Sequence, residues 1–485
     1  MKSALAAAVV LVALTGTAAA ENLLQVYEDA LANDPLIREA NANRLATREA
    51  RPQAWAALLP QINATLQASR NPSEAIEPVF QRGEEGGPVN IFTVPTDSDT
   101  DTEGYTLQLR QSVFSWQNLM ALRRSAHEVA QAEVDYQAAA QDLILRVAER
   151  YFDVLAARDN LEAEQAALEA ISQQLEQAEK RFEVGLIAIT DVQEARAARD
   201  SAAAAVIAAK RALATAEELL REITNRQYDH LAKPSDDMPL KTPEPADEER
   251  WVEASLNQNL ALVSSRLAAD IARENVRVAR GGHFPTLDLV ASRSDFTNDV
   301  DTTITGTDQR GVFTTERTDD RIQLQLNIPL FSGGLTQSQV RESQYRWIAA
   351  KERVARVSRE TERAARDAYL GVISEIARVK ALRQALESSQ TALTATEAGY
   401  EVGTRTAVDV LDARRTLVQA QTNYARSRYD YLLNVIRLRL AAGQLDKATL
   451  AEINEWLTVT APLRPSLTEK PSGQSQQPGT AEPQR

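Results

Sequence analysis

Two stretches of the chain place an apolar residue at every seventh position, which is the pattern of a coiled-coil seam. The positions are Leu161, Leu168, Leu175 and Phe182 and, 218 residues later, Val379, Leu386, Leu393 and Tyr400. Residues 118–184 contain neither Pro nor Gly, and as a helix they would extend for about 100 Å. We therefore expect two long helical hairpins that turn at Gly185 and Gly403, where the backbone needs a residue that tolerates positive φ.

Elsewhere apolar and polar residues alternate, which predicts strands with one apolar and one polar face. The alternation covers residues 61–68 and 106–110 in the first half of the chain, and residues 286–291 and 321–328 in the second half. Polar stretches at 71–104 and 295–320 connect the two strands of each expected hairpin. Helical segments at 23–58 and 251–280 precede the hairpins, and each runs into a Pro.

The two halves of the chain repeat one another in sequence. The identities at an offset of 218 residues are Glu183/Glu401, Val184/Val402, Gly185/Gly403, Asp191/Asp409, Val192/Val410, Ala195/Ala413 and Arg196/Arg414. We expect a tandem duplication with repeats at 21–232 and 249–443. A Pro-rich linker at 233–248 joins the repeats, a further segment covers 444–464, and residues 465–485 form a tail whose Gln, Pro, Ser and Gly content predicts disorder.

The first twenty residues have the three parts of a signal peptide. A basic start at Lys2 is followed by an apolar run at 4–14 and by the small residues of a cleavage site at 18–20. That apolar run is too short to span a bilayer, which needs about 20 residues. No comparable run recurs later in the sequence, so we expect an exported chain without a transmembrane helix.

Charge and composition exclude several classes of function. The chain has 54 Lys plus Arg against 68 Asp plus Glu, and a net charge of −14 argues against nucleic acid as a partner. It has no Cys and three His, so neither a metal site nor another cofactor is expected. Residues 97–103 resemble the start of a calcium loop, but Thr102 and Gln108 occupy positions that require Gly and Glu. We expect a solvated outer loop there instead.

Four short amphipathic strands cannot close a barrel, and an open sheet leaves unpaired edges. Such edges are not tolerated in a bilayer, so other copies of the chain must complete the sheet. Three copies would supply twelve strands, with Leu and Ile toward lipid and Gln, Asn and Thr toward a wet lumen. Phe114 and Phe331 would lie near the membrane boundary. A soluble sheet with one dry face is the alternative, and it leaves the export signal and the long helices unexplained.

Residues 184–196, their repeat at 402–414, and the segment Ile-Pro-Leu-Phe-Ser-Gly-Gly at 328–334 resemble those of the outer-membrane efflux protein (TolC) family. The resemblance implies a mainly α homotrimer with a 12-stranded membrane β-barrel, four strands per chain, continued by a long α-helical coiled-coil periplasmic tunnel. It also implies that 233–250 and 445–457 form an equatorial collar. The first strand exit departs from the pattern, because it has Trp116 and Gln117 where the second has two Gly.

The same resemblance suggests which residues control the tunnel. It implies a constriction ring of Asp409 and Asp412, in which mutual repulsion raises some carboxyl pKa values and cations are favoured. It also implies gate links that hold the tunnel closed, formed by four residues: Thr190, Asp191, Tyr400 and Arg405. The plainer alternatives are that the two aspartates form a solvated helix face and that Tyr400 is only the seam residue equivalent to Phe182.

The helical turns are the expected docking points for a periplasmic adaptor, also called a membrane fusion protein. They contain Gly185 with Leu186 and Gly403 with Thr404, and three chains would present six such tips to an adaptor ring. The implied function is an exit duct for multidrug efflux and type I secretion. It would lie in the Gram-negative cell outer membrane, contact its lipid, and open when the adaptor and an inner-membrane pump of RND, ABC or MFS type bind.

Two other classes of function remain as alternatives. A trimeric coiled-coil structural or adhesive surface protein would also use heptads, but it would not need duplicated hairpins with polar faces. A periplasmic enzyme is disfavoured, because the sequence has no Gly-x-Ser-x-Gly, phosphate loop, His-Glu-x-x-His or Cys pair. We therefore expect no enzyme activity.

Overall fold

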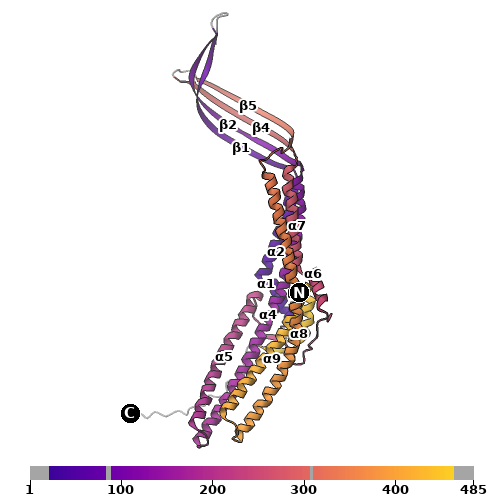
Figure 1. Ribbon diagram of the computed structural model, residues 1–485. Coiled ribbons are helices and arrows are strands. Elements are labelled where there is room, and N and C mark those ends of the chain that lie inside the picture. The colour runs from indigo at the N-terminus through magenta and orange to yellow at the C-terminus, as the bar shows by residue number, and fades with distance from the viewer. Residues whose placement is uncertain (1–20, 83–88, 306–309, 464–485) are drawn as a thin grey trace, which may run out of the picture. The chain divides into compact units, whose positions relative to one another are not determined.

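The computed structural model describes residues 21–82, 89–305 and 310–463 (Figure 1). The helices are α1 (Leu23–Asn33), α2 (Pro35–Arg48), α3 (Ala50–Ala56), α4 (Trp116–Glu183), α5 (Ile189–Thr224), α6 (Glu248–Gln258), α7 (Leu260–Arg280), α8 (Leu335–Glu401), α9 (Ala407–Ala441) and α10 (Lys447–Asn454). The strands are β1 (Gln61–Arg82), β2 (Val89–Ser115), β3 (His230–Pro234), β4 (Thr286–Ile304), β5 (Arg310–Asn327) and β6 (Leu457–Pro462). The predicted signal peptide and tail lie outside the described residues.

The described residues fall into two compact units. The helical unit comprises 21–43, 134–264 and 355–463, and the sheet unit comprises 44–133 and 265–354. Among the described residues, none of the helices is both long enough and apolar enough to cross a membrane.

The sheet unit contains one antiparallel sheet in the order β1-β2-β4-β5 (Figure 1). Its register places apolar and polar side chains on opposite faces, as the alternation predicts. The row Ile62, Leu109, Ala291 and Ile322 lies on one face, and the row Asn63, Gln108, Ser292 and Arg321 lies on the other. On the polar face the Arg110 guanidinium donates to the Asp288 carboxylate at 3.0 Å. Because β2 pairs with β4, the hairpin of the first half joins that of the second half directly.

The strands are much longer than the alternation predicted. The four strands contain 22, 27, 19 and 18 residues, so most of the polar stretches at 71–104 and 295–320 continue the sheet. The loop predicted at 97–103 is wrong as well, since Asp99 pairs with both Pro72 and Asp301. Thr side chains and cross-strand ion pairs such as Arg70 with Asp99 at 2.8 Å allow polar residues to remain in strands.

The first hairpin also extends beyond the second one. Pairing between β2 and β4 begins at Thr96, so residues 76–82 and 89–95 form a two-stranded ribbon. The ribbon exposes apolar side chains, among them Ile76 at 72% exposure. An isolated hairpin of this kind is only marginally stable in water.

The two strands that lead into long helices end differently. On the first exit β2 passes into α4 without a turn, and the Ser115 hydroxyl accepts a hydrogen bond from the Asn118 backbone N–H at 3.2 Å. On the second exit β5 ends at Asn327, and Gly333 and Gly334 adopt φ of 63° and 83° before α8 begins. This difference accounts for the sequence departure at Trp116, since a direct exit needs no residue with positive φ. It also places Phe331 after the strand rather than at its end.

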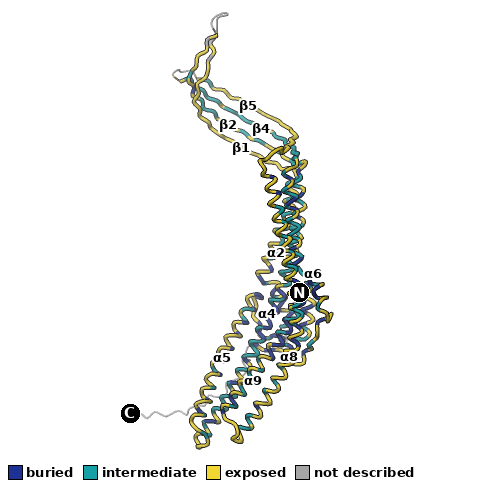
Figure 2. The backbone as a smooth tube through the Cα atoms, in the orientation of Figure 1, coloured by how far each residue is buried: buried dark blue, intermediate teal, exposed yellow. Residues whose placement is uncertain are grey.

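The core of the helical unit lies where α4 meets α9. Tyr151 and Phe152 of α4 and Tyr429 of α9 are fully buried, and the Phe152 and Tyr429 rings stack with centroids 5.7 Å apart. Figure 2 shows the buried positions in dark blue along these helices. The Tyr429 hydroxyl donates to an Asp159 carboxylate oxygen at 2.6 Å, and burial raises the pKa of Tyr429 well above its ordinary value. The buried Tyr429 hydroxyl therefore has a hydrogen-bond partner.

Strands β3 and β6, which adjoin the segments expected to form the collar, pack onto the same helices. Strand β3 pairs with β6, and the Tyr151 hydroxyl donates to the Ala232 carbonyl of β3 at 2.6 Å. The Arg158 side chain donates to the Pro462 carbonyl of β6 at 2.7 Å. These bonds join segments far apart in sequence to the middle of α4.

Candidate functional site

The first helical tip is the turn between α4 and α5. Gly185 has a φ of 74°, its N–H donates to the Phe182 carbonyl, and the Leu186 N–H donates to the Arg181 carbonyl, both at 2.9 Å. This pair of bonds is the Schellman motif, which uses the last free carbonyls of a helix. The Leu186 side chain is 73% exposed, so the tip presents an apolar residue to its surroundings.

The second tip, between α8 and α9, has the same backbone with different side chains. Gly403 has a φ of 80°, and its N–H donates to the Tyr400 carbonyl at 3.1 Å. The Thr404 N–H donates to the Gly399 carbonyl at 2.8 Å, and the Thr404 hydroxyl donates to the same oxygen at 3.0 Å. Thr404 is therefore bound within the turn, whereas Leu186 is free to contact a partner.

Asp409 caps the start of α9. Its carboxylate accepts hydrogen bonds from the Thr406 backbone N–H at 2.8 Å and from the Thr406 hydroxyl at 2.9 Å. In return the Asp409 N–H donates to the Thr406 hydroxyl at 3.2 Å, which completes a capping box. Two hydrogen bonds hold the pKa of Asp409 below its ordinary value: the one from the Thr406 backbone N–H has the larger effect, and the one from the Thr406 hydroxyl the smaller. The positive charge of Arg405 lowers this pKa further. Within one chain the shift is thus opposite to the one expected for a crowded ring.

The capping role of Asp409 was missed from the sequence, although Thr-x-x-Asp is a capping pattern. The matching position before α5 is Ala188, which has no side chain able to cap, and that helix has no side-chain cap. Asp412 lies one helical turn beyond Asp409, and Arg415 approaches its carboxylate at 3.3 Å with both side chains well exposed.

Tyr400 contacts the other helical hairpin through a residue that the sequence did not single out. The Arg181 guanidinium of α4 lies 5.1 Å from the centroid of the Tyr400 ring of α8, a cation–π contact. Thr190 and Asp191 lie in the first turn of α5. Within the described part of one chain, no hydrogen bond or ion pair joins Thr190 or Asp191 to Tyr400 or Arg405. Any such link must form between chains or in another state.

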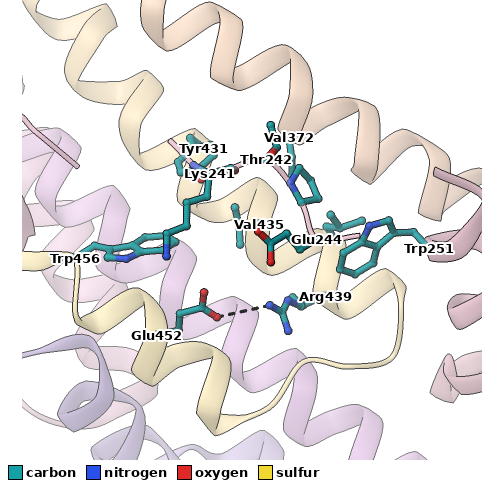
Figure 3. A pocket seen from close by; sticks show the side chains of 12 residues that line it. Lys241, Thr242, Glu244, Trp251, Val372, Tyr431, Val435, Arg439, Glu452 and Trp456 are labelled. Carbon is teal, nitrogen blue, oxygen red and sulfur yellow. Dashed lines mark hydrogen bonds and ion pairs between the residues drawn. The ribbon is translucent and has the colours of Figure 1, made fainter. Parts of the chain in front are cut away.

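A separate pocket of about 210 Å³ lies in the helical unit (Figure 3). Trp456 and Trp251 stand on opposite sides of it. The Arg439 guanidinium pairs with Glu452 at 3.6 Å on its lower side, and the Lys241 ammonium lies 5.5 Å from the centre of a Trp456 ring. The pocket lining contains two cations, Lys241 and Arg439, and two carboxylates, Glu244 and Glu452. It contains none of the predicted site residues.

The sequence of the chain is similar to those of known proteins. The sequence model of the family described as "Outer membrane efflux protein" matches residues 26–226 and 251–444. The chain is 36% identical to "Outer membrane protein TolC" of Escherichia coli (strain K12) over 444 residues, which cover 90% of this chain and 85% of that protein. It is 28% identical to "Alkaline protease secretion protein AprF" of Pseudomonas aeruginosa over 442 residues, covering 91% of this chain and 88% of that protein.

Solved structures of outer membrane proteins have a similar fold. The crystal structure of the outer membrane protein VceC from Vibrio cholerae superposes with a TM-score of 0.66 at 19% identity, covering 87% of this chain and 96% of that chain. This likeness confirms the predicted fold class, a membrane β-barrel portion continued by a long α-helical tunnel. The chain belongs to the outer membrane efflux protein family and is an exit-duct protein of the Gram-negative outer membrane.

Proposed function

We propose that three copies of the chain assemble into one duct with a 12-stranded barrel. Within the described residues, β1 and β5 each pair with a single neighbour, so both edges of the sheet have free backbone groups. In a bilayer these groups need partners, and β5 of one copy is the natural partner of β1 of the next. The observation that carries the proposal is the register of the sheet, since its polar rows would then line a continuous wet lumen.

The duct is passive, and its periplasmic end is the point of control. Asp409 and Asp412 lie on the first two turns of α9, and three copies of each would form acidic rings that favour cations. Arg405 and Tyr400 would link to Thr190 and Asp191 of a neighbouring helix pair and keep the tunnel closed. Each link contributes only about 1–3 kcal/mol, so the binding of a partner can open the gate.

The helical tips are the proposed docking surface for a periplasmic adaptor. Leu186 is the strongest candidate contact, because its side chain is apolar and exposed while only its backbone N–H takes part in the turn. Gly185 and Gly403 shape the two tips, and Thr404 completes the second one. The adaptor would connect the duct to an inner-membrane pump of RND, ABC or MFS type.

The relatives suggest two kinds of cargo. One is named for the secretion of an alkaline protease and others for efflux, so we include both type I secretion and multidrug efflux in the proposal.

Conductance of purified protein in planar bilayers tests the proposal. A duct should give single channels that are closed for most of the time, and Arg405→Ser or Tyr400→Phe should increase the open fraction. A trimeric adhesive coiled coil would give no channels at all. An unchanged closed-state conductance in both variants would refute the gate while leaving the duct intact.

A further inference from the structure

The two helical tips differ at positions that the duplication would otherwise make equal. Position 181 in the first hairpin is Arg, and the matching position 399 in the second is Gly. Position 187 is Ile, and the matching position 405 is Arg. Compared with the first tip, the second tip therefore has an arginine in place of isoleucine after the turn and a glycine in place of arginine before it.

The structure shows why these two changes belong together. The Cβ and Cγ atoms of Arg405 lie next to Gly399. A Cβ atom at position 399 would lie 2.8 Å from Arg405 Cγ, 3.2 Å from the Thr404 hydroxyl oxygen and 3.5 Å from Arg405 Cβ. The first of these distances is shorter than real Cβ contacts allow, so any larger residue at 399 would displace the aliphatic stem of Arg405.

The backbone of the turn does not by itself require glycine at this position. In the second tip the Gly399 carbonyl accepts the Thr404 N–H at 2.8 Å and the Arg405 N–H at 3.2 Å. In the first tip the Arg181 carbonyl accepts the Leu186 N–H in the same way at 2.9 Å. Since an arginine serves there, the carbonyl role leaves position 399 open to other residues. Glycine is also a poor helix former, so its presence in the last turn of α8 needs another reason.

Gly399 fixes the start of the Arg405 side chain while its charged end remains exposed. Among the described residues, the Arg405 guanidinium has no hydrogen-bond or ion-pair partner within the chain. A long arginine held near its base and free at its end loses less entropy when it binds than a fully mobile one. We propose that Gly399 is a positioning residue that directs Arg405 toward its partner across the gate. This inference rests on the gate role of Arg405 proposed above.

Gly399→Ala tests the inference against a matched control in the same helix. Gly371 also lies within α8, and a Cβ there would meet only Asn434 atoms at 3.7 and 3.8 Å, which is ordinary contact. Both substitutions improve helix propensity, so neither trimer should melt at a lower temperature than the native one. In planar bilayers Gly399→Ala should raise the open-to-closed ratio by at least about tenfold, because one charge-assisted bond is lost in each chain. Gly371→Ala should leave it unchanged.

Arg405→Ala separates the inference from the gate proposal. If Gly399 acts through Arg405, adding Gly399→Ala to an Arg405→Ala channel should change the open-to-closed ratio by less than about twofold. A leaky Arg405→Ala channel together with a tight Gly399→Ala channel would overturn the inference and leave the gate standing. If the effects of the two substitutions on the open-to-closed ratio add in the double variant, Gly399 has a merely structural role and the inference is overturned. A lower melting temperature for Gly399→Ala would lead to the same conclusion. A tight Arg405→Ala channel would refute the gate itself and the inference with it.

Discussion

Replacing Arg181 with glutamine should make the duct leak. Arg181 lies on α4 and its guanidinium faces the Tyr400 ring of α8 at 5.1 Å, so the contact joins the two helical hairpins near their tips. Glutamine keeps part of the aliphatic stem and the polarity of the side chain but removes the cation that the ring attracts. The two hairpins should then separate more easily.

The size of the effect follows from the exposure of the pair. Arg181 and Tyr400 are both partly exposed, and a cation–π contact at such a site is worth about 0.5–1 kcal/mol. If the three chains of the proposed trimer open together, the loss amounts to about 1.5–3 kcal/mol. Because about 1.4 kcal/mol corresponds to a factor of ten, the open-to-closed ratio should rise roughly ten- to hundredfold.

Single-channel recording in planar bilayers measures this ratio directly. Arg199→Gln is the matched control, since Arg199 is an exposed arginine of α5 that pairs with its neighbour Asp200 at 2.9 Å, and it should behave as the native chain does. Tyr400→Leu removes both the ring and the hydroxyl, so it should leak more than Arg181→Gln, and adding Arg181→Gln to it should have no further effect. Tyr400→Phe keeps the ring and loses the hydroxyl, so its effect should add to that of Arg181→Gln. A tight Arg181→Gln channel beside a leaky Tyr400→Leu channel would refute the reasoning.

Three further predictions concern docking, capping and the core. Leu186→Ser should weaken adaptor cross-linking, with a loss of about 1–2 kcal/mol per tip, and should not lower the melting temperature of the trimer. Thr406→Ala should cost about 1 kcal/mol of local stability at the start of α9, seen as faster amide hydrogen exchange there. Since the pKa of Asp409 is lowered, its cap is fully present above the ordinary value of about 3.9 and is lost as the pH falls through the lowered value. Protection of these amides should therefore be flat from about pH 7 to 5 and fall only in stronger acid. Tyr429→Phe removes the buried donor to Asp159 and should destabilise the fold by about 1–3 kcal/mol, measured by denaturant unfolding.

Matched exposed residues serve as controls for these variants. Ile207 of α5 is nearly as exposed as Leu186, at 69% against 73%, so Ile207→Ser should leave adaptor cross-linking intact. Tyr345 is also 69% exposed, and Tyr345→Phe should leave stability unchanged. Undiminished cross-linking in Leu186→Ser would contradict the docking role, and equal stability of Tyr429→Phe and the native chain would contradict the importance of the buried bond. Loss of amide protection already at pH 6 would contradict the lowered pKa of Asp409.

Much of the fold could be predicted because its periods are long and regular. The seven-residue repeat indicated the long helices, and the period-two alternation gave the two faces of the sheet. The ends of the strands could not be predicted, because their outer parts carry polar residues on both faces. There the alternation disappears while cross-strand pairs such as Arg70 with Asp99 continue the sheet.

The site was predictable only where chain position alone determines a role. Gly185 could be placed at a turn because it ends a run without Pro or other Gly, and Gly403 because it repeats Gly185 at the offset of 218 residues. The contact of Arg181 with Tyr400 and the fit of Arg405 over Gly399 depend on how side chains pack in three dimensions. The capping pair of Thr406 and Asp409 had a local signal in the sequence, the Thr-x-x-Asp pattern at the start of α9.

The pairing of β2 with β4 has a consequence for the symmetry of the assembly. This pairing joins the two halves of one chain by the same antiparallel contact that operates within each hairpin. A single half could therefore build a ring only as six identical copies, and every substitution would appear six times. Fusing two halves lowers the order of the rotation axis from six to three, so alternate hairpins can evolve separately. The first hairpin has Ile187 and Ala188 at the positions where the second has Arg405 and Thr406. Only a fused pair of halves can maintain differences of this kind.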